Sequence, residues 1–183
     1  MSRFALPRWS LIAALLLLTF TAAVGSLLFG AVDLSVARLF AAATGNGDKV
    51  ASIILFDLRL PRTILALAVG AMLGLAGAAL QGFLRNPLAE PSVLGTSNAA
   101  ALGGVAAIYF GLADIHPIVL PVLATGGALL SLALLVILSG KAESPLTLIL
   151  AGIAVGTLAV AGTSLALNLS PNPFAAMEIM TWL

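Results

Sequence analysis

Long apolar runs with almost no charged residues recur along this chain and limit what it can fold into. Residues 9–32 contain no charged side chain over 24 positions, and about 20 apolar residues are enough for a helix to cross a bilayer. Only 8% of all residues are charged and 61% are hydrophobic, whereas soluble domains carry roughly 25% charged residues. The chain is therefore expected to fold in lipid.

We predict an all-α fold, a polytopic transmembrane bundle of about five spans that together form one permease-like domain over residues 1–183. The expected spans are residues 9–32, 62–83, 92–111, 118–138 and 146–168. They are joined by extramembrane loops at 33–61, 84–91 and 139–145 and followed by a tail at 169–183. For the first run a cleavable signal peptide is the alternative, disfavoured because signal peptides have apolar regions of only about 7–15 residues.

The first loop holds much of the chain's charge and has two short helical patterns. Asp33 or Ser35 is a candidate N-cap for a helix that reaches Ala43. Residues 50–58 predict a second short helix. We expect it to end just before Pro61, because proline restricts the backbone of the residue that precedes it.

Small residues recur every fourth position in two of the predicted spans. These are Ala66, Gly70, Gly74, Ala78 and Gly82 in the second span, and Gly95, Ala99, Gly103, Ala107 and Gly111 in the third. Such ridges let membrane helices approach closely. The last span carries Gly152 and Gly156 on one face. Ordinary glycine content of membrane helices is the alternative explanation.

The loop at 84–91 is a polar hairpin. Pro87 and Pro91 rule out a continuous helix there. Glu90 precedes the third span, where a carboxylate complements the helix N-terminus; a transport role is the less favoured interpretation. Asn98 lies beyond the hairpin, and a polar side chain at that depth is expected to face other helices or a wet cavity.

Several classes of function are disfavoured by what the sequence lacks. It has no cysteine and a single histidine, His116, so no metal-ligand cluster is formed and no cofactor site is expected. Ser97 is the candidate nucleophile of an intramembrane enzyme, but His116 lies in a loop at the far side of the membrane. A net charge of +1 does not indicate nucleic-acid binding. A secondary transporter usually has an ionisable residue within a span, and the predicted spans contain none at mid-depth.

Five motifs, in this order, resemble one family. They are RLPR at 59–62, NPLAEP at 86–91, LGTSNAA at 94–100, LILAGIAVG at 148–156 and MTWL at 180–183. Together they are similar to the FecCD-type permeases of ABC importers, which take up ferric siderophores, haem or cobalamin. In the third motif, Asn-Ala-Ala stands where the family pattern has a glycine after the asparagine.

The resemblance implies a transport subunit rather than an enzyme. Family permeases lie in the bacterial cytoplasmic membrane with a cytoplasmic N-terminus. Their partners are a second permease copy, a cytoplasmic ATP-binding subunit and a periplasmic substrate-binding protein. Charge alone leaves the orientation open, since four arginine and lysine side chains fall on each side of the predicted membrane.

The resemblance also implies roles for the arginines of RLPR. The first arginine of this motif docks acidic residues of the binding protein, so this role falls to Arg59, with Arg62 as the second candidate. A local ion pair with Asp57 is the alternative role for Arg59. Docking outside the membrane would account for the positive charge on that side.

In the same family, two loops form the cytoplasmic gate and the fifth span lines the path. The matching gate positions are Asn86 and Leu88 in the first loop and Ser144 in the second. Gly152 and Gly156 would line the path near the dimer axis. Together with Gly70, Gly74, Gly95 and Asn98, these glycines form the expected set of path-lining and helix-packing residues.

Length is the main departure from the family pattern. Family members have ten spans and are nearly twice as long, so the resemblance covers the N-terminal half only. If 183 residues were the whole protein, we would expect no ATP-coupled transport by this chain alone and would regard it as a membrane scaffold fragment. The sequence does not identify the cargo.

Overall fold

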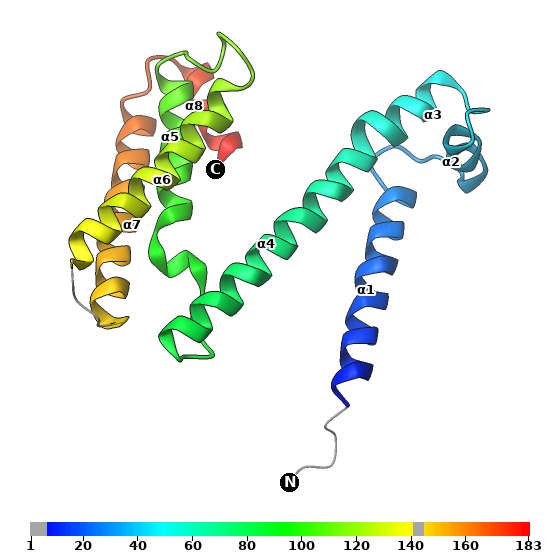
Figure 1. The fold of residues 1–183 in the computed structure, drawn as a ribbon. Helices are drawn as coiled ribbons and strands as arrows, with labels where there is room; N and C mark the ends of the chain where they lie inside the picture. The colour runs from blue at the N-terminus through cyan, green and yellow to red at the C-terminus, as the bar shows by residue number, and fades with distance from the viewer. Residues whose placement is uncertain (1–6, 141–144) are drawn as a thin grey trace. The chain divides into compact units, whose positions relative to one another are not determined.

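The computed structural model describes residues 7–140 and 145–183, and these form helices, turns and loops with no strand (Figure 1). In chain order the helices are α1 (Arg8–Leu28), α2 (Val36–Ala43), α3 (Lys49–Ile53), the π-helical turn η1 (Ile54–Arg59), α4 (Leu60–Leu84), the 3-10 turn η2 (Pro91–Leu94), α5 (Thr96–Tyr109), α6 (Val119–Ser139), α7 (Pro145–Asn168) and α8 (Pro173–Trp182). The predicted all-α class is confirmed. The chain divides into two compact units, residues 1–74 and 75–183.

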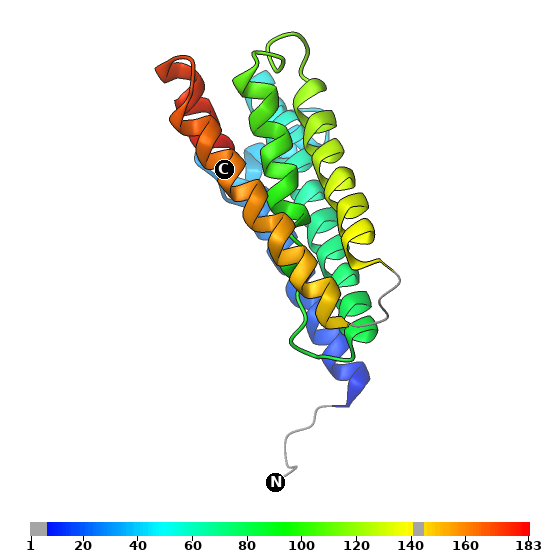
Figure 2. The same cartoon turned by 90° about the vertical axis from the view of Figure 1, so that its left-hand side faces the viewer.

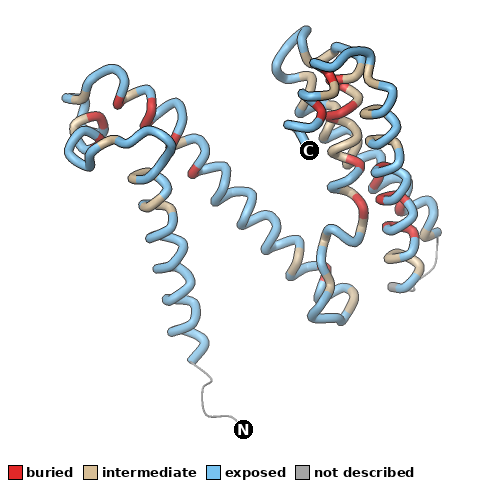
Figure 3. Tube along the Cα trace, turned by 180° about the vertical axis from the view of Figure 1, so that it is seen from behind, coloured by how far each residue is buried: buried red, intermediate tan, exposed pale blue. Residues whose placement is uncertain are grey.

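Four helical segments of the described chain are long and apolar enough to cross a membrane. They are α1, the continuous helical run from Lys49 to Leu84, α6, and residues Leu146–Asn168 of α7. Helix α1 has no buried residue at all, and its apolar side chains are exposed along its whole length (Figure 3). Such exposure of large apolar side chains is expected in lipid and not in water. The chain is a multi-pass membrane protein.

The expected continuous span at 92–111 is wrong. Pro91 opens η2, and Gly95 then adopts a left-handed conformation with φ of 71° before α5 begins. Helix α5 has 14 residues, or about 21 Å at 1.5 Å per residue, which is short of the hydrocarbon thickness of about 30 Å. The apolar run continues through this break, so hydropathy alone did not reveal it.

The expected end of the helix before Pro61 is also wrong. The helical run passes through Pro61 because η1 is a π-helical turn, in which the amide of Leu60 donates to the carbonyl of Leu55, five residues back. Proline in an α-helix collides with the carbonyl four residues before it. The wider π turn shifts that carbonyl and accommodates the ring. The span predicted at 62–83 is thus part of a longer helix.

The extramembrane part of the first unit has its own small core. Leu39 and Ala42 of α2 pack against Ala51 and Leu55. Ser35, rather than Asp33, is the N-cap of α2, its hydroxyl accepting the amide hydrogen of Arg38 at 3.3 Å. This confirms one of the two predicted caps.

In the second unit, α5 packs against α6, α7 and α8 (Figure 2). Two positions of close approach between α5 and α6 require glycine: a Cβ on Gly103 would collide with the carbonyl of Leu123, and one on Gly127 with the carbonyl of Ala99. The predicted ridge of the third span is therefore a packing surface.

The segment expected to be a tail at 169–183 contains a helix that folds back onto α5. Asn172 caps α8 by accepting the amide hydrogen of Ala175 at 2.9 Å. At the other end, a Cβ on Gly104 would come within 2.5 Å of the Trp182 ring, whose indole N–H donates to the carbonyl of Ala101 at 3.4 Å. This region is packed structure rather than a free tail.

Asp48 generates a prediction about pH. It caps α3 by accepting the amide hydrogen of Ala51 at 2.6 Å and pairs with Arg38. The Ala51 amide, and then the Arg38 guanidinium, lower the pKa of Asp48 below its ordinary value of 3.8. Because the folded pKa is depressed, the stabilisation is complete above the unfolded pKa and is lost as pH falls through the folded pKa.

We therefore expect Asp48→Ala to lower the hydrogen-exchange protection of the Ala51 and Ser52 amides at neutral pH. Wild-type protein should lose the same protection only below the ordinary aspartate range. Asp33→Ala is the control, since Asp33 accepts no side-chain hydrogen bond within the described residues. Equal protection in the Asp48 and Asp33 variants would contradict the capping role.

Two adjacent glycines of α6 provide a matched test of the packing. Gly127→Ala is expected to lower the free energy of unfolding by about 1–3 kcal/mol, the usual cost of overpacking. A Cβ on Gly126 would meet nothing within 4 Å, so Gly126→Ala should be neutral or stabilising by up to about 1 kcal/mol through helix propensity. Denaturation with SDS followed by circular dichroism measures both. Equal losses would show that α5 and α6 do not pack as described.

Candidate functional site

The first candidate site lies at the C-terminal end of α1 and is built around Arg59. Arg59 belongs to η1 and is only 8% exposed. Its guanidinium donates to the carbonyls of Leu27 at 2.8 Å, Leu28 at 2.9 Å and Val32 at 2.6 Å. Carbonyls at a helix end have no partner within the helix. A cation there also complements the negative end of the helix dipole, worth up to about 2 kcal/mol when partly buried.

The surroundings of Arg59 fit this arrangement. The Thr63 hydroxyl donates to the carbonyl of Arg59 at 2.9 Å and lies 3.0 Å from the Ser26 hydroxyl of α1. Gly30 leaves room for the guanidinium, since a Cβ there would come within 3.0 Å of an Arg59 nitrogen. The alternative role for Arg59, an ion pair with Asp57, is not formed. The ion pair within residues 7–140 and 145–183 is that of Arg38 and Asp48.

Arg62, the second predicted docking residue, is exposed. It lines a pocket of about 240 Å³ next to Arg59, between the end of α1 and η1. The side chains that line this pocket include both arginines and no carboxylate. The structure thus places the two arginines of the motif together but in different environments, one buried and one accessible.

The second candidate site is the helix break before α5, where it meets α7. A Cβ on Gly95 would lie 2.6 Å from both the carbonyl oxygen of Gly152 and the amide nitrogen of Gly156. A Cβ on Gly156 would lie 3.3 Å from the amide nitrogen of the Asn98 side chain. The structure therefore brings together four of the predicted path and packing residues: Gly95, Asn98, Gly152 and Gly156. Their role in a path stays a prediction.

Gly70 and Gly74 are not part of either site. Both are exposed on α4, and a Cβ added to either would meet no atom of residues 7–74 within 4 Å. The ridge predicted on this span is therefore an unused face within the first unit. Its packing role stays a prediction.

The first predicted gate loop is an ordered turn. The Asn86 side chain accepts the amide hydrogen of Leu88 at 2.9 Å, and the amide of Gln81 donates to the carbonyl of Ala89 at 3.4 Å. This turn leaves the Leu88 side chain 87% exposed. Ser144 lies outside the described residues. A gating function for these residues stays a prediction.

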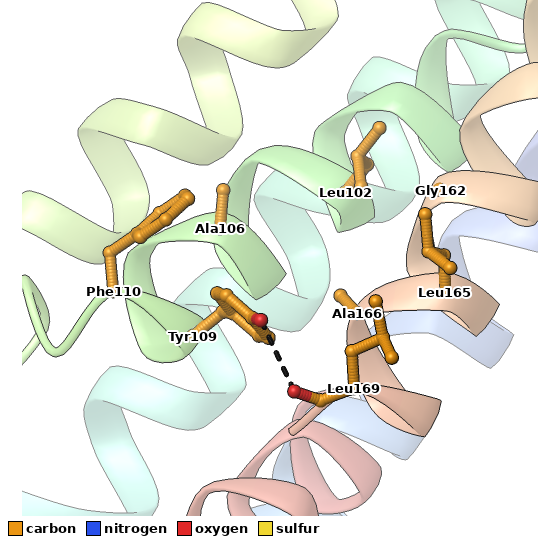
Figure 4. A pocket seen from close by; sticks show the side chains of 8 residues that line it. All are labelled: Leu102, Ala106, Tyr109, Phe110, Gly162, Leu165, Ala166 and Leu169. Carbon is orange, nitrogen blue, oxygen red and sulfur yellow. Dashed lines mark hydrogen bonds between the residues drawn. The ribbon is translucent and has the colours of Figure 1, made fainter. Parts of the chain in front are cut away.

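An apolar pocket of about 250 Å³ lies between α5 and α7 (Figure 4). Tyr109 is its polar group, and its hydroxyl donates to the carbonyl of Leu169 at 3.1 Å. The other seven lining residues are apolar or glycine. Within the described residues no three histidine, aspartate or glutamate side chains converge as metal ligands. We find in this part of the chain no arrangement of groups for catalysis.

The sequence analysis did not single out several residues that hold these sites together. Thr63 and Ser26 join α1 to α4, and Gly104 and Trp182 join α5 to α8. A signal for Thr63 was present, since a hydroxyl within an apolar span must bond inside the protein. Gly104 lies one position off the predicted ridge and gave no periodic signal.

Comparison with known proteins decides the family, since residues 15–183 match the FecCD transport family. The chain belongs to this family. It is 37% identical over 149 residues to the uncharacterised ABC transporter permease YvrB of Bacillus subtilis, covering 79% of this chain and 42% of YvrB. It is 38% identical over 128 residues to the vitamin B12 import permease BtuC of Salmonella newport, covering 70% of this chain and 39% of BtuC.

The fold agrees with that of a FecCD-like solved structure. That structure is described as an inward-facing conformation assigned to the metal-chelate type of ABC transporter, with a TM-score of 0.78 and 35% sequence identity. The similarity covers 95% of this chain and 52% of the solved one. The chain thus spans about two fifths of the curated permeases and half of the solved structure that it matches.

The helix break generates a prediction with an internal control. Gly95 and Gly111 both have positive φ, 71° and 66°, and a left-handed conformation costs a non-glycine residue about 1–2 kcal/mol. A Cβ on Gly111 would meet nothing within 4 Å. Gly95→Ala should therefore destabilise the protein by about 1–3 kcal/mol more than Gly111→Ala, because it adds overpacking against α7. SDS denaturation of both variants measures the difference. Equal destabilisation would argue against the contact with α7.

Proposed function

We propose that this chain forms part of the permease subunit of an ABC importer for metal-chelate or cobalamin-type cargo. The observation that carries the proposal is the family match over residues 15–183. The break at Gly95 and its contact with α7 support it, because irregular backbone at membrane depth is tolerated where it is buried in protein or lines a water-filled cavity.

In the proposed topology the N-terminus is cytoplasmic, in the bacterial inner membrane. The loop at 33–61 and the arginine pocket then face the periplasm and a substrate-binding protein. Two features support this docking role: Arg62 is exposed, and the pocket has no carboxylate of its own. An acidic group from a partner would complement such a surface.

The loop that contains Asn86 and Leu88, together with Ser144, is proposed to form the cytoplasmic gate, close to an ATP-binding subunit. Gly95, Asn98, Gly152 and Gly156 are proposed to border the path, which a second permease copy would complete. Asn98 is exposed, and it is the polar side chain of this group. A path with neutral walls suits a conduit that is driven by a separate ATPase and does not bind its cargo tightly.

The test is an uptake measurement in the source cells. We expect deletion of the gene that carries this sequence to reduce the uptake of radiolabelled cobalamin, ferric siderophore or haem to background for one of these cargoes, and the wild-type gene to restore it. Uptake should be lost equally when the neighbouring ATP-binding subunit carries a substitution that prevents hydrolysis.

The control separates the alternative, a secondary transporter. Collapsing the proton gradient while ATP is maintained should leave uptake intact if the ABC proposal is right. Uptake that survives the ATPase substitution and stops with the gradient would overturn it. Normal uptake of all three cargoes in the deletion strain would contradict the proposed cargo class.

A further inference from the structure

We propose that Arg59 is a positioning residue. Its guanidinium fixes the C-terminal end of α1 on the π-helical turn, and this leaves Arg62 as the accessible cation of the neighbouring pocket. The inference deepens the proposed function by dividing the two motif arginines into one that shapes the docking pocket and one that contacts the partner. Only the part concerning Arg62 rests on the proposed function.

The hydrogen bonds of Arg59 define the fixed contact. The carbonyls of Leu27 and Leu28 belong to the last turn of α1, and that of Val32 belongs to the loop that leaves it. A planar guanidinium has five donors in a rigid fork and can hold several acceptors at once. Arg59 thereby connects the helix end and the loop to η1 and leaves only 8% of its surface exposed.

The contact matters because α1 has little else to hold it. None of its residues is buried, and Leu27 and Leu28 are its side chains that pack, partly buried, against the core formed by α2, α3 and η1. The Ser26 and Thr63 hydroxyls add one hydrogen bond at the same level. The attachment of α1 is thus concentrated at its C-terminal end, around Arg59.

The π turn places the two arginines differently. Arg59 ends η1 and lies against α1, while Arg62 lies in the first turn of α4 and is exposed. A buried guanidinium whose hydrogen bonds are already used cannot approach a partner without breaking them. The accessible charge of the pocket therefore belongs to Arg62, and its position depends on the contact that Arg59 makes.

The first experiment measures this contact directly. The chain has no cysteine, and the Ser26 and Thr63 hydroxyl oxygens lie 3.0 Å apart, so a Ser26→Cys/Thr63→Cys pair should form a disulfide rapidly in membranes. We expect Arg59→Ala to slow its formation by about tenfold, as the loss of hydrogen bonds from a charged donor predicts. Arg62→Ala should leave the rate unchanged. An unchanged rate in Arg59→Ala would overturn the proposal.

The second experiment asks whether Arg59 acts through Arg62. The probe is the substrate-binding protein encoded beside this permease, and its Kd is measured on the chain in nanodiscs. Arg62→Ala should weaken binding about tenfold and reduce its salt dependence. Arg59→Ala should also weaken binding, but closing the Ser26→Cys/Thr63→Cys disulfide should restore it. The same disulfide should not restore binding in Arg62→Ala.

The rescue separates a positioning role from direct contact. If Arg59 contacts the partner itself, binding stays weak after the disulfide closes, and the inference is wrong. If the wild-type chain does not bind the partner at all, the proposed function and the role of Arg62 fail. The crosslinking rates then still decide whether Arg59 fixes α1.

Discussion

Backbone carbonyls without an intrahelical partner are the constraint on which this structure depends most. In lipid no water is present to bond them, and each has to be satisfied within the protein. Arg59 serves this purpose at the end of α1, where it bonds three carbonyls. The Tyr109 hydroxyl does so beyond α7, at Leu169. Both side chains also connect one helix to another, so the satisfaction of helix ends and the joining of helices are one event.

The second unit is held together by close backbone contact instead of large side chains. At Gly95, Gly103 and Gly127, a single added carbon would meet the backbone of a neighbouring helix. Hydrophobic burial gives little drive between helices when the solvent is lipid, and van der Waals packing has to supply it. This explains how three helices can pack tightly although most of their leucines face outward (Figure 3).

The parts of the fold that depend on local chemistry could be predicted from the sequence. Apolar runs located α1, α6 and α7 to within a few residues, and the four-residue spacing identified Gly95, Gly152 and Gly156 as contact positions. The rest depends on tertiary contacts. Helix continuity through Pro61 requires the π turn, and that turn is supported by the bonds from Arg59 to α1. The fold-back of α8 depends on Trp182 finding Gly104, which no periodic pattern records.

The π-helical turn has one more consequence, for how the gene can change. A π turn contains one residue more than the α-helix requires, so it rotates everything that follows by about 100° relative to what precedes it. Loss of one residue between Ile54 and Arg59 would remove that phase shift. The face of α4 that carries Arg62 and Thr63 would then turn away from α1, although no residue of the RLPR motif had changed. Length in this segment should therefore be under stronger selection than its apolar side chains.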